Sequence, residues 1–225
     1  MVGAFRQPDK TIIEPAFLST LPTRDFLSGY AELLKTALLD SDDFLSSAIA
    51  FIEDFMEQDD NSKIKNQKSK IKNLIDRAIS VKQHYVSADP TEQGLRKALN
   101  LGHTIGHALE ELHHTPYTIH HTPLPHGYAV LYGLLAELYL SQLILPNADP
   151  EPLRLLSRVL IDYYGKPTCS CKDYDKLIEL MRSDKKNASA DAITFTLLQK
   201  VGDPVINQVA TPSQIREALD YLFNL

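Results

Sequence analysis

The stretch from Arg96 to Glu110, RKALNLGHTIGHALE, holds the residue types in this chain that are best suited to chemistry. Read as one helix, it places a cation, an amide and two imidazoles on a single face, at Arg96, Asn100, His103 and His107. Neutral imidazoles at i, i+4 can both approach one divalent ion. We expect such a helix to line a cleft, because apolar residues flank the polar stripe.

Two glycines lie beside this stripe, and each lowers helix propensity by roughly 1 kcal/mol relative to alanine. Gly102 and Gly106 are four residues apart, so they share one side of the expected helix. A helix tolerates glycine where another backbone or a ligand must come close. We therefore expect a close approach on this side.

The ordinary alternative is that these histidines belong to the core or the surface, as most single histidines on helices do. The zinc-protease motif needs a Glu beside the first His, and it is absent because Thr104, Ile105 and Gly106 fill the interval. Two histidines that share a face with an Asn and an Arg are a less common coincidence. Binding of a metal or a ligand is therefore the stronger hypothesis.

The composition is that of an ordinary soluble globular protein. Of 225 residues, 44% are hydrophobic and 23% are charged, which suits one large domain or two small ones. The net charge of -6 argues against nonspecific binding of nucleic acid. We find no apolar run of the ~18–20 residues that a membrane span needs, and no signal-peptide pattern. These features predict a cytoplasmic protein without nucleic-acid or membrane partners.

The two cysteines, Cys169 and Cys171, are too close in sequence for a usual structural disulfide, and no second pair exists to complete a metal site. We expect free thiols in a reducing compartment. Histidine is more informative, because seven of the eight histidines lie between positions 103 and 126. Outside the central stripe, we expect exposed loop residues at His113, His114, His120 and His121.

Apolar periodicity predicts a mainly helical chain with a small β-hairpin. The expected helices are Leu21–Asp40 with Thr23 as N-cap, Ser41–Met56, Arg96–Glu110, Gly127–Leu143, Pro152–Tyr164, Tyr174–Met181 and Ile215–Phe223, the last begun by a capping box at Thr211–Gln214. The expected strands are Ile193–Leu198 and Val205–Val209. The repeated SKIKN segments, at Ser62–Asn66 and Ser69–Asn73, are expected to begin a solvated helix, and Asp89–Glu92 a turn or helix start.

Taken in order, the motifs resemble those of the 3-dehydroquinate synthases of the shikimate pathway. That family's signature is a basic residue, LNxGHTxGHAxE and a downstream HGxAV, and this chain has Arg96, LNLGHTIGHALE and HGYAV from His126. GAFRQP near the start, LPTRDFLSGYAELLK, ADPTEQGLR and the late DKK at 184–186 also match in order. The resemblance extends over nearly the whole chain.

The resemblance implies a parent enzyme in which an N-terminal NAD-binding α/β domain precedes a mostly helical metal-binding domain. Residues 1–225 are expected to be a single domain of the second kind, and no glycine-rich phosphate loop follows any expected strand. The implied cofactors are Zn²⁺ or Co²⁺ in this domain and NAD, held mainly by the other. A homodimer is the implied assembly, and a phosphorylated sugar acid is the implied small-molecule substrate.

By spacing alone, Glu32 and Lys35 indicate a surface ion pair of little energetic value. The resemblance instead implies that Glu32, His103 and His126 are the protein ligands of a catalytic zinc. It implies substrate contacts from Lys35, Lys82, Arg96, Asn100, His107 and one of Lys185 and Lys186. Arg96 suits a carboxylate, because its planar fork of donors matches two oxygens.

The implied activity is that of a phosphorus–oxygen lyase. It converts 3-deoxy-D-arabino-heptulosonate 7-phosphate into 3-dehydroquinate and phosphate, on the route to chorismate and the aromatic amino acids. NAD would transiently oxidise a ring hydroxyl, and zinc would make the proton of that hydroxyl easier to remove. This chain alone is expected to have no turnover. Tyr128 replaces a glutamate common in the family, which predicts the loss of a carboxylate near the metal.

Three alternatives stay open. Related sugar-phosphate cyclases and metal-dependent alcohol dehydrogenases share the implied architecture, although Asn100 within the full motif favours the dehydroquinate enzyme. The chain can also be a metal-binding helical module without catalysis. A structural interaction domain is favoured only if the histidines bind nothing.

Overall fold

The computed structural model describes residues 9–57, 67–114, 123–183 and 193–225. In these ranges the chain is mainly helical and has one two-stranded antiparallel sheet, which confirms the expected fold class. The first SKIKN segment, His120 and His121 lie outside the described residues.

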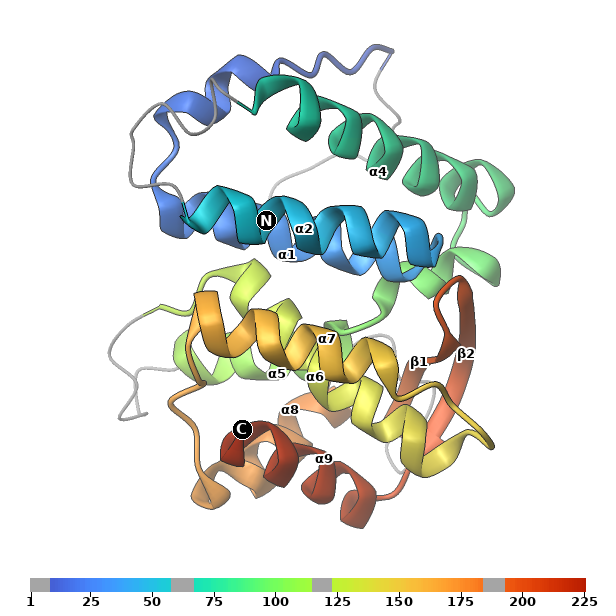
Figure 1. Cartoon of the computed structure of the whole chain (residues 1–225). Helices are drawn as coiled ribbons and strands as arrows, with labels where there is room; N and C mark the ends of the chain where they lie inside the picture. The colour runs from blue at the N-terminus through green and yellow to red at the C-terminus, as the bar shows by residue number, and fades with distance from the viewer. Residues whose placement is uncertain (1–8, 58–66, 115–122, 184–192) are drawn as a thin grey trace.

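The longer helices of the described ranges are α1 (Thr23–Leu38), α2 (Asp42–Glu57), α4 (Lys68–Ala88), α5 (His103–His114), α6 (His126–Ile144), α7 (Glu151–Val159), α8 (Tyr174–Ser183) and α9 (Pro212–Asn224). Short helical segments of 3-10 or π type are η1 (Pro15–Thr20), η2 (Leu95–Asn100), η3 (Leu160–Tyr164) and η4 (Cys171–Asp173). The strands are β1 (Ile193–Lys200) and β2 (Asp203–Ala210). Figure 1 shows α1, α2 and α4 as one group, with α5 to α9 and the hairpin below it.

An aromatic stack holds α1 against α2. The rings of Phe26 and Phe55 lie 4.4 Å apart, and those of Tyr30 and Phe51 lie 5.7 Å apart. Arg77 of α4 donates hydrogen bonds to the carboxylates of Asp40, between α1 and α2, and of Asp43, in the first turn of α2. These contacts hold α1, α2 and α4 together as one group.

Helix α6 forms the middle of the core and packs against α1, α5, α7, α9 and β1. By length and composition this helix is apolar enough to cross a membrane, although polar residues interrupt its apolar sequence. In the structure, 72% of its apolar window is buried inside the protein. The helix even buries an acidic side chain, Glu137, completely.

The prediction of one continuous helix over Arg96–Glu110 is wrong. The chain instead forms η2, turns at Leu101 and Gly102, and begins α5 at His103. Gly102 has φ of 78°, in the left-handed region that favours glycine and that a regular helix does not use. The functional side chains on either side of this turn therefore do not share one helix face.

The predicted close approach at the glycines is confirmed. A Cβ added at Gly106 would lie 2.9 Å from the carbonyl oxygen of Ala129 in α6. A Cβ added at Gly133 of α6 would lie 2.0 Å from the carbonyl oxygen of Gly102. The start of α5 and the middle of α6 thus meet backbone to backbone.

The predicted hairpin forms, and it supports the same turn. β1 pairs antiparallel with β2, with Ile193 opposite Ala210. From β1, the Thr196 hydroxyl donates a hydrogen bond to the carbonyl oxygen of Lys97 in η2. The Thr104 hydroxyl of α5 donates to the carbonyl oxygen of Thr194. The hairpin therefore braces both η2 and the first turn of α5.

Other local predictions have mixed outcomes. Thr211 and Gln214 form the predicted capping box of α9, and both cysteines are free thiols. Thr23 is not the N-cap of α1, because Pro22 occupies that position. His113 is not an exposed loop residue. It lies buried in α5, with its imidazole against the carbonyl oxygen of Leu109.

Replacing Gly133 with alanine should destabilise the fold, because the new methyl group would collide with a backbone carbonyl and displace the start of α5. We expect the free energy of unfolding, measured by urea denaturation, to fall by about 1–3 kcal/mol or more. Gly29→Ala is the matched control: nothing lies within 4 Å of its added Cβ inside α1, so it should stabilise by up to about 1 kcal/mol. Equal effects in the two variants would contradict this packing.

Candidate metal centre

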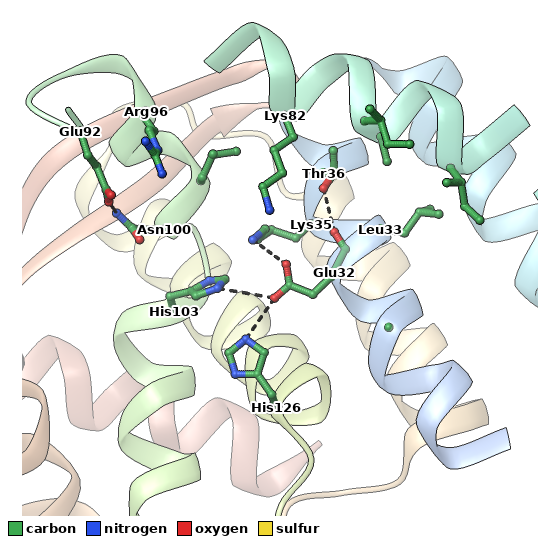
Figure 2. A pocket seen from close by; sticks show the side chains of 15 residues that line it. Glu32, Leu33, Lys35, Thr36, Lys82, Glu92, Arg96, Asn100, His103 and His126 are labelled. Carbon is green, nitrogen blue, oxygen red and sulfur yellow. Dashed lines mark hydrogen bonds and ion pairs between the residues drawn. The ribbon is translucent and has the colours of Figure 1, made fainter. Parts of the chain in front are cut away.

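Side chains from five elements surround one pocket of about 670 Å³ (Figure 2). Most of the predicted site residues line it, namely Glu32 and Lys35 of α1, Lys82 of α4, Arg96 and Asn100 of η2, His103 of α5 and His126 of α6. His107 adjoins this group, and Lys185 and Lys186 lie outside the described residues. The structure thus brings together residues that are more than ninety positions apart in the sequence.

A glycine places His126 beside α1. The Gly127 N–H donates a hydrogen bond to the Ser28 hydroxyl, at 3.0 Å. A Cβ at Gly127 would lie 1.7 Å from the Ser28 carbonyl oxygen, so only glycine permits this approach. The first turn of α6 therefore rests directly on α1, one turn before Glu32.

One carboxylate oxygen of Glu32 lies between two imidazoles. Glu32 Oε1 is 3.5 Å from His103 Nε2 and 3.4 Å from His126 Nε2. The Glu32 side chain as a whole is 35% exposed, but this oxygen is buried and has no hydrogen bond of good geometry. Figure 2 shows both imidazoles turned toward it.

The far nitrogen of each imidazole is held by an oxygen acceptor. His103 Nδ1 is 3.1 Å from the carbonyl oxygen of Leu101, and His126 Nδ1 is 2.8 Å from the carboxylate of Glu110. Carbonyl and carboxylate oxygens only accept, so each Nδ1 carries the proton that it donates. Each ring therefore presents Nε2 to Glu32, as histidine ligands of metals do.

These donors fit a divalent cation. Burial, aided by the charge of Lys35, lowers the pKa of His103 to about 3, so its Nε2 carries a lone pair that faces the Glu32 oxygen. Two acceptors that face one another in a buried place are unfavourable without a positive group between them. Two imidazoles and a carboxylate are a usual donor set for zinc, with a position left open for another ligand.

Without a metal, the positive charge comes from His126. Its contact with Glu32 and its hydrogen bond to Glu110 raise the pKa of the ring to about 9. Burial acts to raise the pKa of Glu32, but His126 and Lys35 outweigh burial and hold that pKa well below its usual range. A proton on His126 and a metal would therefore compete for the same nitrogen.

The structure corrects the expectation of a surface ion pair between Glu32 and Lys35. Lys35 is only 6% exposed, and its Nζ lies 2.7 Å from Glu32 Oε2. Sequence spacing could not reveal this burial, because the cover comes from elements distant in the chain. The pair forms one wall of the pocket.

A second donor set shares two of these residues. Nitrogen atoms of His103, His107 and His126 lie within 4.8 Å of one another, close enough to hold a metal ion. The rings of His103 and His107 have their centroids 5.2 Å apart. The third ligand is thus either Glu32 or His107 by geometry alone.

On the other side of the pocket, Glu92 is a residue that sequence reasoning missed. Its carboxylate accepts a hydrogen bond from the Asn100 side chain at 2.8 Å (Figure 2). Glu92 has φ of 59°, in a tight turn whose amides bind the carboxylate of Asp89. That carboxylate also accepts the backbone N–H of Arg96. The signal available was the expected turn at Asp89–Glu92, which gave no reason to choose Glu92.

Tyr128 does not stand in for a carboxylate at the metal centre. Its ring packs against Tyr164, with centroids 4.9 Å apart, and it is not among the residues that line the pocket. The predicted loss of a carboxylate near the metal stays a prediction.

Comparison with known proteins gives one family. The family described as 3-dehydroquinate synthase C-terminal matches residues 29–187. A 3-dehydroquinate synthase of Parabacteroides distasonis is 41% identical over 223 residues, which are 98% of this chain and 58% of that protein. A 3-dehydroquinate synthase of Halalkalibacterium halodurans is 35% identical over 98% of this chain and 56% of that protein. The chain thus spans somewhat more than half the length of these relatives.

Solved structures of two other enzymes share the fold. A 2-epi-5-epi-valiolone synthase from Streptomyces hygroscopicus, with NAD+ and Zn²⁺ bound, has a TM-score of 0.76 at 22% identity and covers 98% of this chain and 57% of that chain. A 2-deoxy-scyllo-inosose synthase, complexed with carbaglucose-6-phosphate, NAD+ and Co²⁺, has a TM-score of 0.67 at 21% identity, covering 91% and 54%. At this identity the likeness concerns the fold.

Zinc binding by this chain should strengthen as the pH rises from about 6 to 8. The metal must displace the proton of His126, whose pKa of about 9 keeps the ring charged in this range. The apparent dissociation constant should fall about tenfold for each pH unit. A competition titration against a chromophoric chelator, corrected for the protonation of the chelator, measures it.

Glu110→Gln provides the control for this pH dependence. It removes one of the two carboxylates that raise the pKa of His126, so the affinity should level off at a lower pH. An affinity of the unmodified chain that does not change with pH would contradict the competition.

Proposed function

Because this chain belongs to the 3-dehydroquinate synthase family, whose C-terminal region matches residues 29–187, we propose that it forms the metal- and substrate-binding part of a 3-dehydroquinate synthase. The reaction would convert 3-deoxy-D-arabino-heptulosonate 7-phosphate into 3-dehydroquinate and phosphate. The observation that carries the proposal is the buried oxygen of Glu32 between two imidazole nitrogens, within a pocket that also holds cations for an anionic ligand.

The proposed metal ligands are Glu32, His103 and His126. A zinc or cobalt ion held there would supply a Lewis acid for the substrate hydroxyl that is to be oxidised. The protein's own task is to aim the donors: Leu101 holds the ring of His103, and Glu110 holds the ring of His126. Partners of this kind set the orientation of a ligand and its affinity for the metal.

The pocket gathers three cations, Lys35, Lys82 and Arg96, against the two carboxylates of Glu32 and Glu92. A divalent ion would make this balance strongly positive, which suits a ligand with a phosphate and a carboxylate. We assign the carboxylate to Arg96, because a guanidinium can bind both of its oxygens.

The remaining predicted residues have proposed roles on the substrate. Asn100, held by Glu92, presents its amide to substrate hydroxyls, and Lys35 presents its ammonium beside the metal ligands. His107 would bind a hydroxyl next to the metal. Lys185 and Lys186 stay predictions, because they lie outside the described residues.

We propose that NAD is bound mainly by a part of the protein beyond these 225 residues. Two facts support this: the matched family covers a C-terminal region, and the chain spans 58% of its relative from Parabacteroides distasonis. The structural neighbours carry NAD+ together with Zn²⁺ or Co²⁺. The lack of turnover by this chain alone, a cytoplasmic location and a homodimer stay predictions.

A related sugar-phosphate cyclase is the second candidate, because the two solved structures described above share this fold and are enzymes of other names. The substrates of the candidates differ at the group that Arg96 is proposed to bind. A heptulosonate has a carboxylate there, and a simple heptulose phosphate does not. Binding of the two sugars therefore distinguishes the candidates.

Arg96→Ala should weaken binding of the heptulosonate 7-phosphate to the zinc-loaded chain by about 10- to 100-fold, because a charged hydrogen-bonded pair is lost. Binding of a heptulose 7-phosphate without the carboxylate should change little. Isothermal titration calorimetry measures both. Arg24→Ala is the matched control, since Arg24 lies outside the pocket and donates to the carbonyl oxygen of Pro123.

Each other result points away from the proposal. Tighter binding of the sugar without a carboxylate would favour another cyclase. An equal loss for both sugars would mean that Arg96 does not read the carboxylate. A zinc-loaded chain that binds neither sugar would favour a metal-binding module without catalysis.

A further inference from the structure

Glu137 is a fully buried acidic residue in the middle of α6 that takes no part in the pocket. Its carboxylate accepts two backbone N–H groups at the start of α5. Oε2 lies 2.6 Å from the nitrogen of Gly102, and Oε1 lies 3.2 Å from the nitrogen of Ile105. A buried carboxylate is unfavourable unless hydrogen bonds compensate it, so this position has a structural reason.

The two N–H groups are those that a capping box satisfies. With His103 as the first residue of α5, Gly102 is the N-cap and Ile105 is the third helical residue. In a capping box, side chains of the same helix bind these two groups reciprocally. Here one side chain from a neighbouring helix binds both. Its negative charge also lies where the dipole of α5 favours an anion.

The N-cap residue of α5, Gly102, cannot supply the capping side chain itself, because there is no room for one. A Cβ at Gly102 would lie 2.7 Å from Leu134 Cγ and 3.0 Å from the Leu134 nitrogen. The positive φ of Gly102 would strain any other residue as well. The turn is pressed closely onto α6, and α6 supplies its hydrogen-bond acceptor through Glu137.

A single peptide group links Glu137 to His103 of the candidate metal centre. The N–H of Gly102 and the carbonyl of Leu101 are the two ends of one planar unit. The N–H end binds Glu137, and the carbonyl end accepts the Nδ1–H of His103 at 3.1 Å. Turning this peptide would turn the imidazole whose Nε2 faces Glu32.

We propose that Glu137 is a positioning residue for His103, acting through the Leu101–Gly102 peptide, an inference that rests on the proposed metal function. The carboxylate fixes the plane of that peptide and thereby the direction of His103 Nε2. Its charge also polarises the peptide, so the Leu101 carbonyl becomes a better acceptor for the imidazole. The arrangement places a carboxylate behind a metal-ligating histidine, with a peptide group between them.

Glu137→Gln tests this role with little change of volume. The glutamine oxygen can accept one N–H, but its NH₂ group would face the other donor. Zinc affinity, from chelator competition, should fall by about 10- to 100-fold. Hydrogen exchange of the Gly102 and Ile105 amides in the metal-free chain, followed by NMR, should accelerate more than that of other core amides.

Ser157→Ala is the matched control, in α7. Ser157 is 8% exposed; its hydroxyl donates to the carbonyl oxygen of Leu153 and lies 3.0 Å from the Tyr221 hydroxyl, so it joins α7 to α9 and not to the start of α5. We expect a comparable fall in thermal stability, with zinc affinity and the two amides unchanged. If both variants affect zinc and exchange alike, Glu137 is only a stabilising residue and the inference is overturned.

Two further results separate this inference from the proposed function. If the unmodified chain binds no zinc, the proposed metal function fails, and amide exchange alone tests the role of Glu137. Unchanged exchange rates at Gly102 and Ile105 in Glu137→Gln then overturn the inference, and selective acceleration at these two amides supports it. If Glu137→Gln does not fold, the unmodified chain serves instead. Its two amides should be among the slowest to exchange, and exchange at exposed-loop rates overturns the inference.

Discussion

The structure depends on bringing the buried oxygen of Glu32 to within about 3.5 Å of two imidazole nitrogens from other helices. An acceptor in this position is costly unless a positive group lies beside it. In the metal-free protein that group is the protonated ring of His126, whose pKa is raised to about 9. We propose that the same geometry holds a divalent ion once that proton leaves. Attraction between the Glu32 carboxylate and a positive group beside the imidazoles therefore favours the meeting of α1, α5 and α6 at this point.

Helix α6 makes this convergence possible. It presents Gly127 to α1 and Gly133 to the start of α5, so both neighbours approach its backbone without intervening side chains. It also supplies Glu137, whose carboxylate occupies the place of a cap that Gly102 cannot provide. One buried helix thus sets the spacing of the metal centre on two sides, which explains why small residues and one acid interrupt its apolar sequence.

Much of this could be predicted from local sequence, because local rules govern it. The hairpin, the capping box at Thr211 and the close approach at Gly106 follow from neighbouring residues alone. The helix break at Gly102 could not be predicted in this way, because glycines four residues apart also occur inside helices that pack closely. Glu32 could be chosen only through the family resemblance, because its two imidazole partners, His103 and His126, are about seventy or more positions away. Glu92 was missed although its partner Asn100 is near in sequence, because the expected turn gave no reason to choose it. The burial of His113 was missed because one of its neighbours, Thr168, is 55 positions away.

The most direct test of the account is the zinc content of the dialysed chain, measured by elemental analysis for the unmodified protein and for Glu32→Ala, His103→Ala and His107→Ala. The account predicts about one zinc per chain, lost on changing Glu32 or His103 and kept on changing His107. Zinc that survives in Glu32→Ala and disappears in His107→Ala would show that three histidines hold the metal and would contradict the central role given to Glu32.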